Sequence, residues 1–251
     1  MRRFKNGEPE TVLYCIGDSH VSFFSGQDRL VPVWPERSVD RLPCFRTFRV
    51  GPVLAWSLAR EGSSTAGREK VGEVLARAVP PGAAVLFCFG EIDCRFHILR
   101  QAERQGRPFA ALAAECAEVY FDAARDLAGP GRTVLFCSVP PSTRLGEVLE
   151  GEYPRLGSCA VRNEVTRAFN RRLQALCGER GLAFVDYDGA LVDGEGLSRA
   201  CFFRDEVHLG QVAMGAFVAA LRRAWPDFRW HPPLRYRMQV ALSRLFGIKV
   251  R

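Results

Sequence analysis

The stretch that decides the fold is Thr11-Val12-Leu13-Tyr14-Cys15-Ile16, an apolar run that leads into Gly17-Asp18-Ser19-His20. A short apolar run that contains β-branched residues and stops at a glycine is typical of a buried β-strand ending in a turn. We therefore expect a strand over 12–16 that delivers Ser19 to its carboxyl end. Further runs of this kind predict strands over residues 45–50, 83–89, 132–138 and 182–187.

Stretches with helical periodicity separate these runs. Helices are expected over residues 52–60, 68–79, 109–127, 163–180 and 211–223. Alternation of strands and helices is typical of a parallel sheet covered by helices on both faces, which is a three-layer α/β/α fold. The chain of 251 residues is long enough for one such domain with a full core, and we expect that domain to span residues 1–226.

Polar residues and a glycine follow three of the expected strands, at the point where each strand ends. Ser19 follows the first strand, Gly51 follows the second, and Glu91 and Asp93 follow the third. Parallel strands end at the same edge of a sheet, and the active groups of α/β proteins gather at that edge. We therefore expect these residues to lie at one rim.

An acid and a histidine stand three residues apart near the other end of the chain, in Asp205-Glu206-Val207-His208. With Ser19 they supply the groups that acyl transfer needs. The hydroxyl attacks, the imidazole takes its proton, and the carboxylate orients the imidazole. Two other interpretations stay open. Asp18 and Ser19 could bond to local backbone in a turn, and Asp205 could cap a helix.

Four blocks of the sequence, taken in order, resemble the SGNH/GDSL hydrolase superfamily. They are Gly17-Asp18-Ser19-His20 (with His20 where the family often has leucine), the isolated Gly51, Gly90-Glu91-Ile92-Asp93 and Asp205-x-x-His208. The resemblance runs from Thr11 to Trp225 and implies a flavodoxin-like α/β fold with a five-stranded parallel sheet. It also implies that Ser19 is the nucleophile, that His208 is the general base and then the general acid, and that Asp205 orients His208.

The third block departs from the family, since Ile92 stands where an asparagine normally helps to bind the developing oxyanion. The resemblance leaves the backbone amides of Ser19 and Gly51 as oxyanion donors. Arg95 is the candidate for the missing donor, because a guanidinium is a permanent cation with five N–H groups. Arg95 could instead form an ion pair with Glu91 or Asp93. The candidate substrate-binding residues are Asp18, His20, Glu91, Asp93, Arg95 and His97.

The residues and the resemblance together predict a serine esterase that removes a small acyl group, such as acetyl, from a carbohydrate or glycan-like molecule. Arg95 favours a carbohydrate ester, because some similar enzymes that act on polysaccharides carry arginine there. The same acyl-enzyme could pass its group to an acceptor hydroxyl, which would make the protein an O-acyltransferase. A binding protein with weakened catalysis is the third possibility. The sequence has no phosphate-binding loop and no Gly-x-Ser-x-Gly elbow, and it implies no cofactor.

Cysteine is frequent, with nine residues, but no Cys-x-x-Cys pair is present. Cys94-x-x-His97 is the one Cys/His pair at a spacing typical of metal ligands, so no metal site is expected. The cysteine number is odd, and no apolar stretch follows the basic N-terminus. Both observations favour a reducing cytoplasm over a disulfide-linked, secreted protein.

The net charge of +7 is concentrated at the end of the chain. Residues 227–251 hold six cations and one anion, a net charge of +5, which leaves +2 for residues 1–226 and argues against a nucleic-acid enzyme. This tail contains a basic amphipathic helix over 234–251, which could lie on an anionic membrane, pack on a partner protein or fold back on its own domain. Its apolar stripe consists of Leu234, Met238, Ala241, Leu242 and Leu245.

Overall fold

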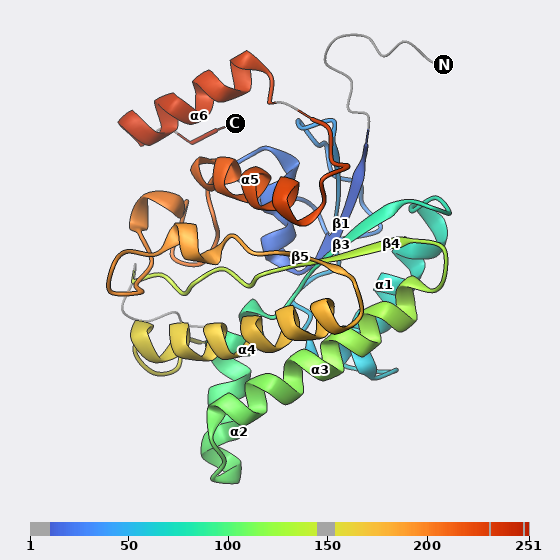
Figure 1. Ribbon diagram of the computed structural model, residues 1–251, viewed down its shortest axis with the longest axis vertical. Helices are drawn as coiled ribbons and strands as arrows, with labels where there is room; N and C mark the ends of the chain where they lie inside the picture. Colours follow the sequence, from blue (N-terminus) through green and yellow to red (C-terminus); the bar gives the residue numbers. More distant parts are fainter. Residues whose placement is uncertain (1–10, 145–153, 231, 248, 251) are drawn as a thin grey trace.

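The computed structural model describes residues 11–144, 154–230, 232–247 and 249–250 (Figure 1). At its centre lies a parallel sheet of five strands in the order β2-β1-β3-β4-β5. The strands are β1 (Leu13–Gly17), β2 (Phe45–Arg49), β3 (Ala84–Cys88), β4 (Thr133–Cys137) and β5 (Ala183–Val185). The five-stranded parallel sheet and the α/β fold class predicted from the sequence are confirmed, with strand bounds that differ by at most two residues.

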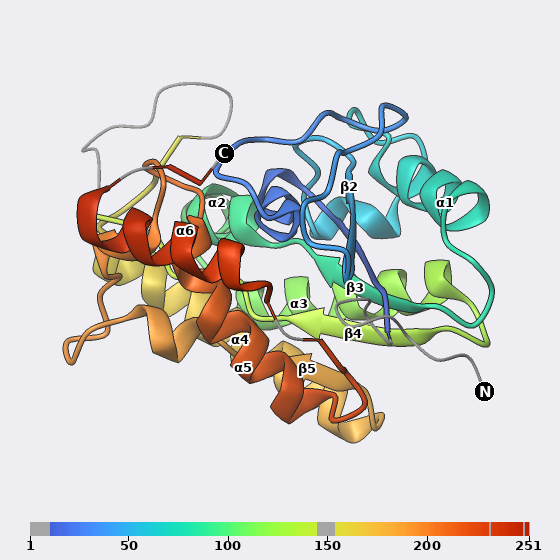
Figure 2. The ribbon, with the colours of Figure 1, turned by 90° about the horizontal axis from the view of Figure 1, so that it is seen from above.

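Helices lie against both faces of the sheet (Figures 1 and 2). They are α1 (Gly67–Arg77), α2 (Ile98–Gln105), α3 (Phe109–Ala128), α4 (Cys159–Glu179), α5 (Met214–Ala224) and α6 (Leu234–Phe246). Short 3₁₀ segments are η1 (Ser19–Ser25), η2 (Trp56–Ala59), η4 (Asp188–Leu191), η5 (Ala200–Phe202) and η6 (Gln211–Ala213), and η3 (Asp93–His97) is a π-helical turn. The helix expected over 52–60 is reduced to η2, and α2 was not expected because it is short and mostly polar.

Side chains alternate between the two faces of each strand, and each face is buried under its own apolar cluster. Ile16 of β1 and Phe87 of β3 pack with residues of α1, α3 and α4. Leu13 of β1 and Leu86 of β3 belong to the cluster that contains residues of η1 and α5. The sheet is therefore the middle of three layers, with α5 above it and α3 and α4 below it in Figure 1.

The packing continues past residue 226, where the sequence analysis places the end of the domain. Phe228 and Trp230 are buried, and their ring centroids lie 6.1 Å and 6.0 Å from that of Phe45 in β2. Residues 248 and 251 of the expected tail helix lie outside the described residues. Over the ranges that the structure covers, no helix is both long enough and apolar enough to cross a bilayer. All nine cysteines belong to these ranges and are free thiols.

Candidate active site

Ser19 lies directly beyond the carboxyl end of β1, at the start of η1. Gly17 makes this position possible, because a Cβ atom there would stand 2.3 Å from the carbonyl oxygen of Cys88 in β3. Only glycine allows the two strand ends to approach so closely. The carboxylate of Asp18 then accepts the backbone N–H of His20 at 2.8 Å and caps η1. These contacts fix the Ser19 hydroxyl at the rim of the sheet.

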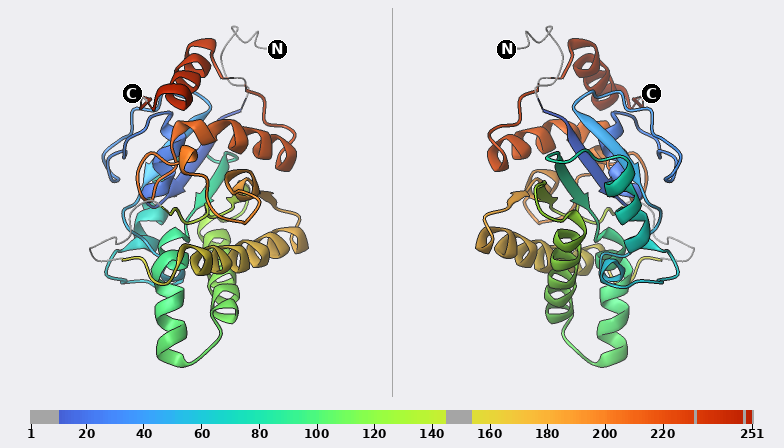
Figure 3. Two further views of the ribbon diagram at one scale, coloured as in Figure 1. Left: turned by 90° about the vertical axis from the view of Figure 1, so that its left-hand side faces the viewer. Right: turned by 90° about the vertical axis from the view of Figure 1, so that its right-hand side faces the viewer.

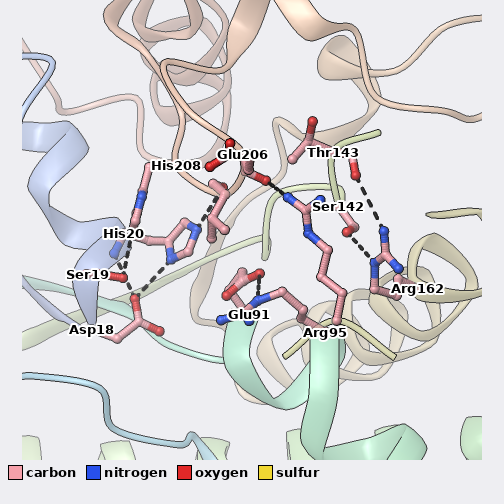
Figure 4. A network of polar contacts seen from close by, with 12 residues as sticks. Asp18, Ser19, His20, Glu91, Arg95, Ser142, Thr143, Arg162, Glu206 and His208 are labelled. Carbon is pink, nitrogen blue, oxygen red and sulfur yellow. Dashed lines mark hydrogen bonds and ion pairs between the residues drawn. The ribbon is translucent and has the colours of Figure 1, made fainter. Parts of the chain in front are cut away.

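His208 comes from a loop 189 residues further along the chain and meets Ser19 directly (Figure 4). Its Nε2 lies 2.9 Å from Ser19 Oγ, and its Nδ1 lies 3.0 Å from both carboxylate oxygens of Asp205. Asp205 Oδ1 also accepts the backbone N–H groups of Val207 at 2.9 Å and His208 at 2.7 Å. Asp205 thus accepts backbone N–H groups of its own loop and holds the imidazole at the same time. No helix begins at this loop, so the alternative interpretation of Asp205 as a helix cap is wrong.

The surroundings of this triad set the charges that a nucleophile and its base require. Burial alone raises the pKa of Asp205, but the hydrogen bond and charge of His208, with two backbone amides, hold it well below its usual range. Burial is the main cause that lowers the pKa of His208, and the charge of His20 lowers it further, against the opposing effect of Asp205. At neutral pH, His208 is therefore neutral and able to take the proton of Ser19.

Gly51 supplies the second backbone amide of the expected oxyanion hole. The register pairs Gly17 of β1 with Arg49 of β2, so Ser19 and Gly51 both stand two residues beyond the last pair. The φ angle of Gly51 is +100°, which residues with a side chain rarely adopt. Neither the Ser19 amide nor the Gly51 amide donates a hydrogen bond to another described residue, so both can donate to a ligand.

Arg95 lies in the π-helical turn η3 and is paired with an acid of the same block. Its Nε donates to Glu91 Oε1 at 2.8 Å, and less than a tenth of either side chain is exposed. This ion pair is the alternative role that the sequence left open. Ile92 is buried and has no polar side-chain atom. The use of Arg95 as an oxyanion donor stays a prediction.

Asp93 faces the interior rather than the rim, which corrects its assignment as a substrate-binding residue. Its carboxylate is fully buried and accepts the backbone N–H groups of Ala55 at 2.7 Å and Trp56 at 3.3 Å. The thiol of Cys116 lies 3.5 Å from the same carboxylate. Burial raises the pKa of Asp93 to about 6. Asp93 therefore ties the start of η2 to η3 and does not face solvent.

His97 lines a cavity of about 590 Å³ between η2 and α2. Burial is the main cause that lowers its pKa, with further contributions from the charges of Arg100 and Arg60, so its ring is neutral at neutral pH. Cys94, which lies in the same π-helical turn η3 as His97, is buried and is a free thiol. No three His, Cys, Asp or Glu side chains of the described ranges are grouped so that they could hold a metal ion.

Arg155 is a residue near the site that sequence reasoning missed. Its guanidinium donates to the backbone carbonyl of Glu206, inside the turn that carries Asp205 and His208. The next residue, Leu156, donates its backbone N–H to the carbonyl of Arg95 at 3.2 Å. Residues 155 and 156 therefore join the turn at 205–208 to η3. No motif marks this arginine, because the partner it contacts lies 51 residues away in the chain.

The chain was compared with protein-family models, with curated protein sequences and with solved structures. No family model matches the chain, and no curated protein sequence matches it either. Several solved structures match it over most of its length. A member of the lipolytic protein G-D-S-L family from Veillonella parvula is 16% identical and has a TM-score of 0.50, with 87% of this chain and 100% of that chain covered.

Two further structures have the same architecture. A proposed arylesterase from Agrobacterium tumefaciens is 17% identical, covers 87% of this chain and 100% of its own, and has a TM-score of 0.50. A proposed platelet activating factor from Streptococcus pneumonia is 16% identical, covers 85% and 83%, and has a TM-score of 0.52. The chain has the SGNH/GDSL fold. This fold was expected from the four sequence blocks and is confirmed.

His20 lies beside His208 and adds to the electrostatics of the site. Its Nδ1 lies 3.3 Å from Asp18 Oδ1, and its Nε2 lies 3.2 Å from the carbonyl oxygen of Val207. Both ring nitrogens face oxygen acceptors, an arrangement that favours the doubly protonated ring. Burial lowers the pKa of His20, but the Asp18 hydrogen bond and the charges of Glu91 and Asp18 outweigh burial and raise that pKa. The ring centroids of His20 and His208 are 4.9 Å apart.

Replacement of His20 by glutamine is expected to move the acid limb of the pH–rate profile to higher pH. The charge of His20 lowers the pKa of His208, so its removal raises that pKa. Because His208 is a base only when neutral, activity is lost as pH falls through this pKa, and the loss begins at a higher pH in the variant. The measurement is kcat/KM for a neutral ester as a function of pH.

His97→Gln is the matched control for this experiment. Burial and the charges of Arg100 and Arg60 lower the pKa of His97. The charge of His97 is not among the causes that shift the pKa of His208. The acid limb of this variant should coincide with that of the original protein. An unchanged limb in His20→Gln as well would mean that His20 carries no charge beside the base.

Proposed function

We propose that the protein is a serine esterase that removes a small acyl group from a carbohydrate or glycan-like ester. The observation that carries this proposal is an unbroken chain of contacts, from Ser19 Oγ to His208 Nε2 at 2.9 Å and from His208 Nδ1 to Asp205 at 3.0 Å. These distances suit a nucleophile, its base and an orienting acid. The SGNH/GDSL fold is consistent with this chemistry.

The reaction proceeds through an acyl-enzyme. Ser19 Oγ attacks the ester carbonyl while His208 Nε2 takes the hydroxyl proton, and Asp205 balances the charge of the resulting imidazolium. The amides of Ser19 and Gly51 donate to the oxyanion. His208 then gives its proton to the alcohol oxygen as the ester C–O bond breaks. Water, deprotonated by His208, attacks the acyl carbonyl and releases the carboxylic acid and Ser19.

We propose that the cavity between η2 and α2, whose lining includes none of Ser19, Asp205 and His208, holds a distal part of a carbohydrate substrate. Its wall includes the ring of Trp56, with the guanidinium of Arg60 6.0 Å from the ring centroid. An aromatic face packs against the C–H face of a sugar ring. The side chains of His97, Gln101 and Gln105, which also line the cavity, can hydrogen-bond to sugar hydroxyls. A saccharide has both C–H faces and hydroxyl groups, so a cavity with an aromatic ring and nearby polar side chains suits it.

Fluorophosphonate labelling tests the nucleophile. The intact protein should take up one phosphonyl group, because an activated serine attacks phosphorus as it attacks an ester carbonyl. Peptide mapping should locate this group on Ser19. A protein that takes up no label under these conditions is a binding module, and labelling at another serine contradicts the assigned site.

A panel of acetylated sugars and aryl acetates tests the carbohydrate part of the proposal. Trp56→Ala should lower kcat/KM for an acetylated oligosaccharide about tenfold and leave kcat/KM for an aryl acetate unchanged, because the proposal requires an extended saccharide, and not an aryl acetate, to reach the cavity. Equal losses on both esters contradict the role given to the cavity. Transfer of acetyl to added acceptor sugars, without release of free acetate, would identify an O-acyltransferase.

A further inference from the structure

The tail helix α6 is attached to the domain by one of its faces. Tyr236 is buried, and its hydroxyl donates to Gln211 Oε1. Beyond the helix, the Val250 N–H donates to Asp28 Oδ2 at 2.7 Å, and the Asp28 N–H donates to the Val250 carbonyl at 2.8 Å. The tail therefore folds back on its own domain, with α6 at the outer edge of the molecule beyond α5 (Figures 1 and 3).

The apolar stripe of α6 faces the opposite way. At about 3.6 residues per turn, Leu234, Met238 and Leu245 project to the side of the helix roughly opposite Tyr236. The exposed apolar side chains on α6 are Leu234 (70%), Met238 (58%), Leu242 (47%), Leu245 (73%) and Phe246 (68%). Elsewhere in the described ranges, only Leu30 and Val39 are large apolar side chains with comparable exposure. A concentration of this kind marks an interaction surface.

Arginines flank this stripe on both sides. The same helical geometry places Arg235 on one flank and Arg237 and Arg244 on the other, and all three are exposed. The sequence of α6 contains no acidic residue, and the segment 227–251 carries a net charge of +5. An apolar stripe bordered by arginines suits a partner with an apolar interior and a negatively charged surface.

We propose that α6 binds the surface of an anionic lipid bilayer and lies parallel to it. The stripe enters the boundary between headgroups and acyl chains, while the arginines on both flanks contact lipid phosphates. A second copy of the chain fits less well, because a two-fold pairing of these helices would set arginines against arginines with no acid on either helix. This surface is separate from the triad, so the proposal does not depend on the esterase activity.

Vesicle co-sedimentation of the full chain tests this proposal. The protein should pellet with vesicles of phosphatidylcholine that contain about one-third phosphatidylglycerol, and much less with phosphatidylcholine alone. Met238→Glu combined with Leu242→Glu should lower the partition coefficient about tenfold or more, because both exposed side chains then resist entry into the bilayer. High salt should also weaken binding, since the attraction of the arginines is screened.

Val39→Glu is the matched control, because it places the same charge on an exposed apolar position outside α6. It should leave vesicle binding unchanged. Equal pelleting of the original protein and the α6 variant overturns the proposal. So does a dimer that forms without vesicles and is lost in the α6 variant, since the stripe would then be covered by a second copy.

Discussion

Replacement of Ser19 by alanine is expected to lower kcat for ester hydrolysis by on the order of 10⁴- to 10⁶-fold. Without the hydroxyl there is no acyl-enzyme, and the remaining groups can only polarise the ester and bind it. The contact of 2.9 Å between Ser19 Oγ and His208 Nε2 is the basis for this expectation. Steady-state hydrolysis of an aryl acetate measures the loss, and circular dichroism checks that the variant is folded.

A double variant sharpens this test. Ser19→Ala combined with His208→Ala should lose no more activity than Ser19→Ala alone, because the hydroxyl and the imidazole act as one unit. Ser38→Ala is the control, since Ser38 only donates to Asp40 at 2.9 Å and lies in a loop outside the triad. Turnover that survives in Ser19→Ala would assign the nucleophile to another residue.

The sheet could be predicted from the sequence because its strands are buried on both faces. Strands of that kind are continuous apolar runs, and the run before Gly17 is one of five that stand out from polar surroundings. Residue type and spacing were also enough to select Ser19, Asp205 and His208. Their meeting across 189 residues has no local signal, since it depends on how the whole sheet and its loops are assembled.

The polar residues after β3 show where sequence reasoning stops. Glu91 and Asp93 stand at the same strand end and were both expected near the substrate. The π-helical turn sends the Asp93 carboxylate into the interior, where amides of Ala55 and Trp56 from another loop complete its hydrogen bonds. No pattern in the sequence around Asp93 predicts those hydrogen-bond partners. Arg155 was missed for the same reason, since its contact with Glu206 is purely tertiary.

In the tail helix α6, the apolar stripe is not the face that contacts the domain. The stripe of α6 was visible in the spacing of Leu234, Met238 and Leu242, and an apolar stripe usually predicts the buried face of a helix. Here the buried contact is made by Tyr236 on the other side, through its hydrogen bond to Gln211. Periodicity reveals that a helix has two faces, but only the tertiary contacts decide which one meets the domain.

Asp205→Asn is expected to lower kcat about 10⁴-fold while leaving the fold of the loop intact. The amide oxygen of asparagine can still accept the N–H groups of Val207 and His208 that Asp205 Oδ1 accepts. Its NH₂ group then faces Nδ1 of His208. NH₂ is a donor, and Oδ1, which also lies 3.0 Å from Nδ1, already accepts two backbone N–H groups. The variant therefore favours the tautomer in which Nδ1 accepts and the ring proton lies on Nε2. In that tautomer Nε2 donates to Ser19 Oγ and cannot take its proton.

Asp193→Asn provides a control that separates this effect from the loss of a turn. Asp193 Oδ1 accepts the backbone N–H groups of Glu195 and Leu197 at 3.0 Å, which is the same kind of turn without a histidine. It should leave kcat within about twofold of the original, since an exposed turn of this kind touches no reacting group. If Asp205→Asn lowered kcat no more than Asp193→Asn does, the carboxylate would serve only the turn, and the tautomer of His208 would have to be fixed by another group.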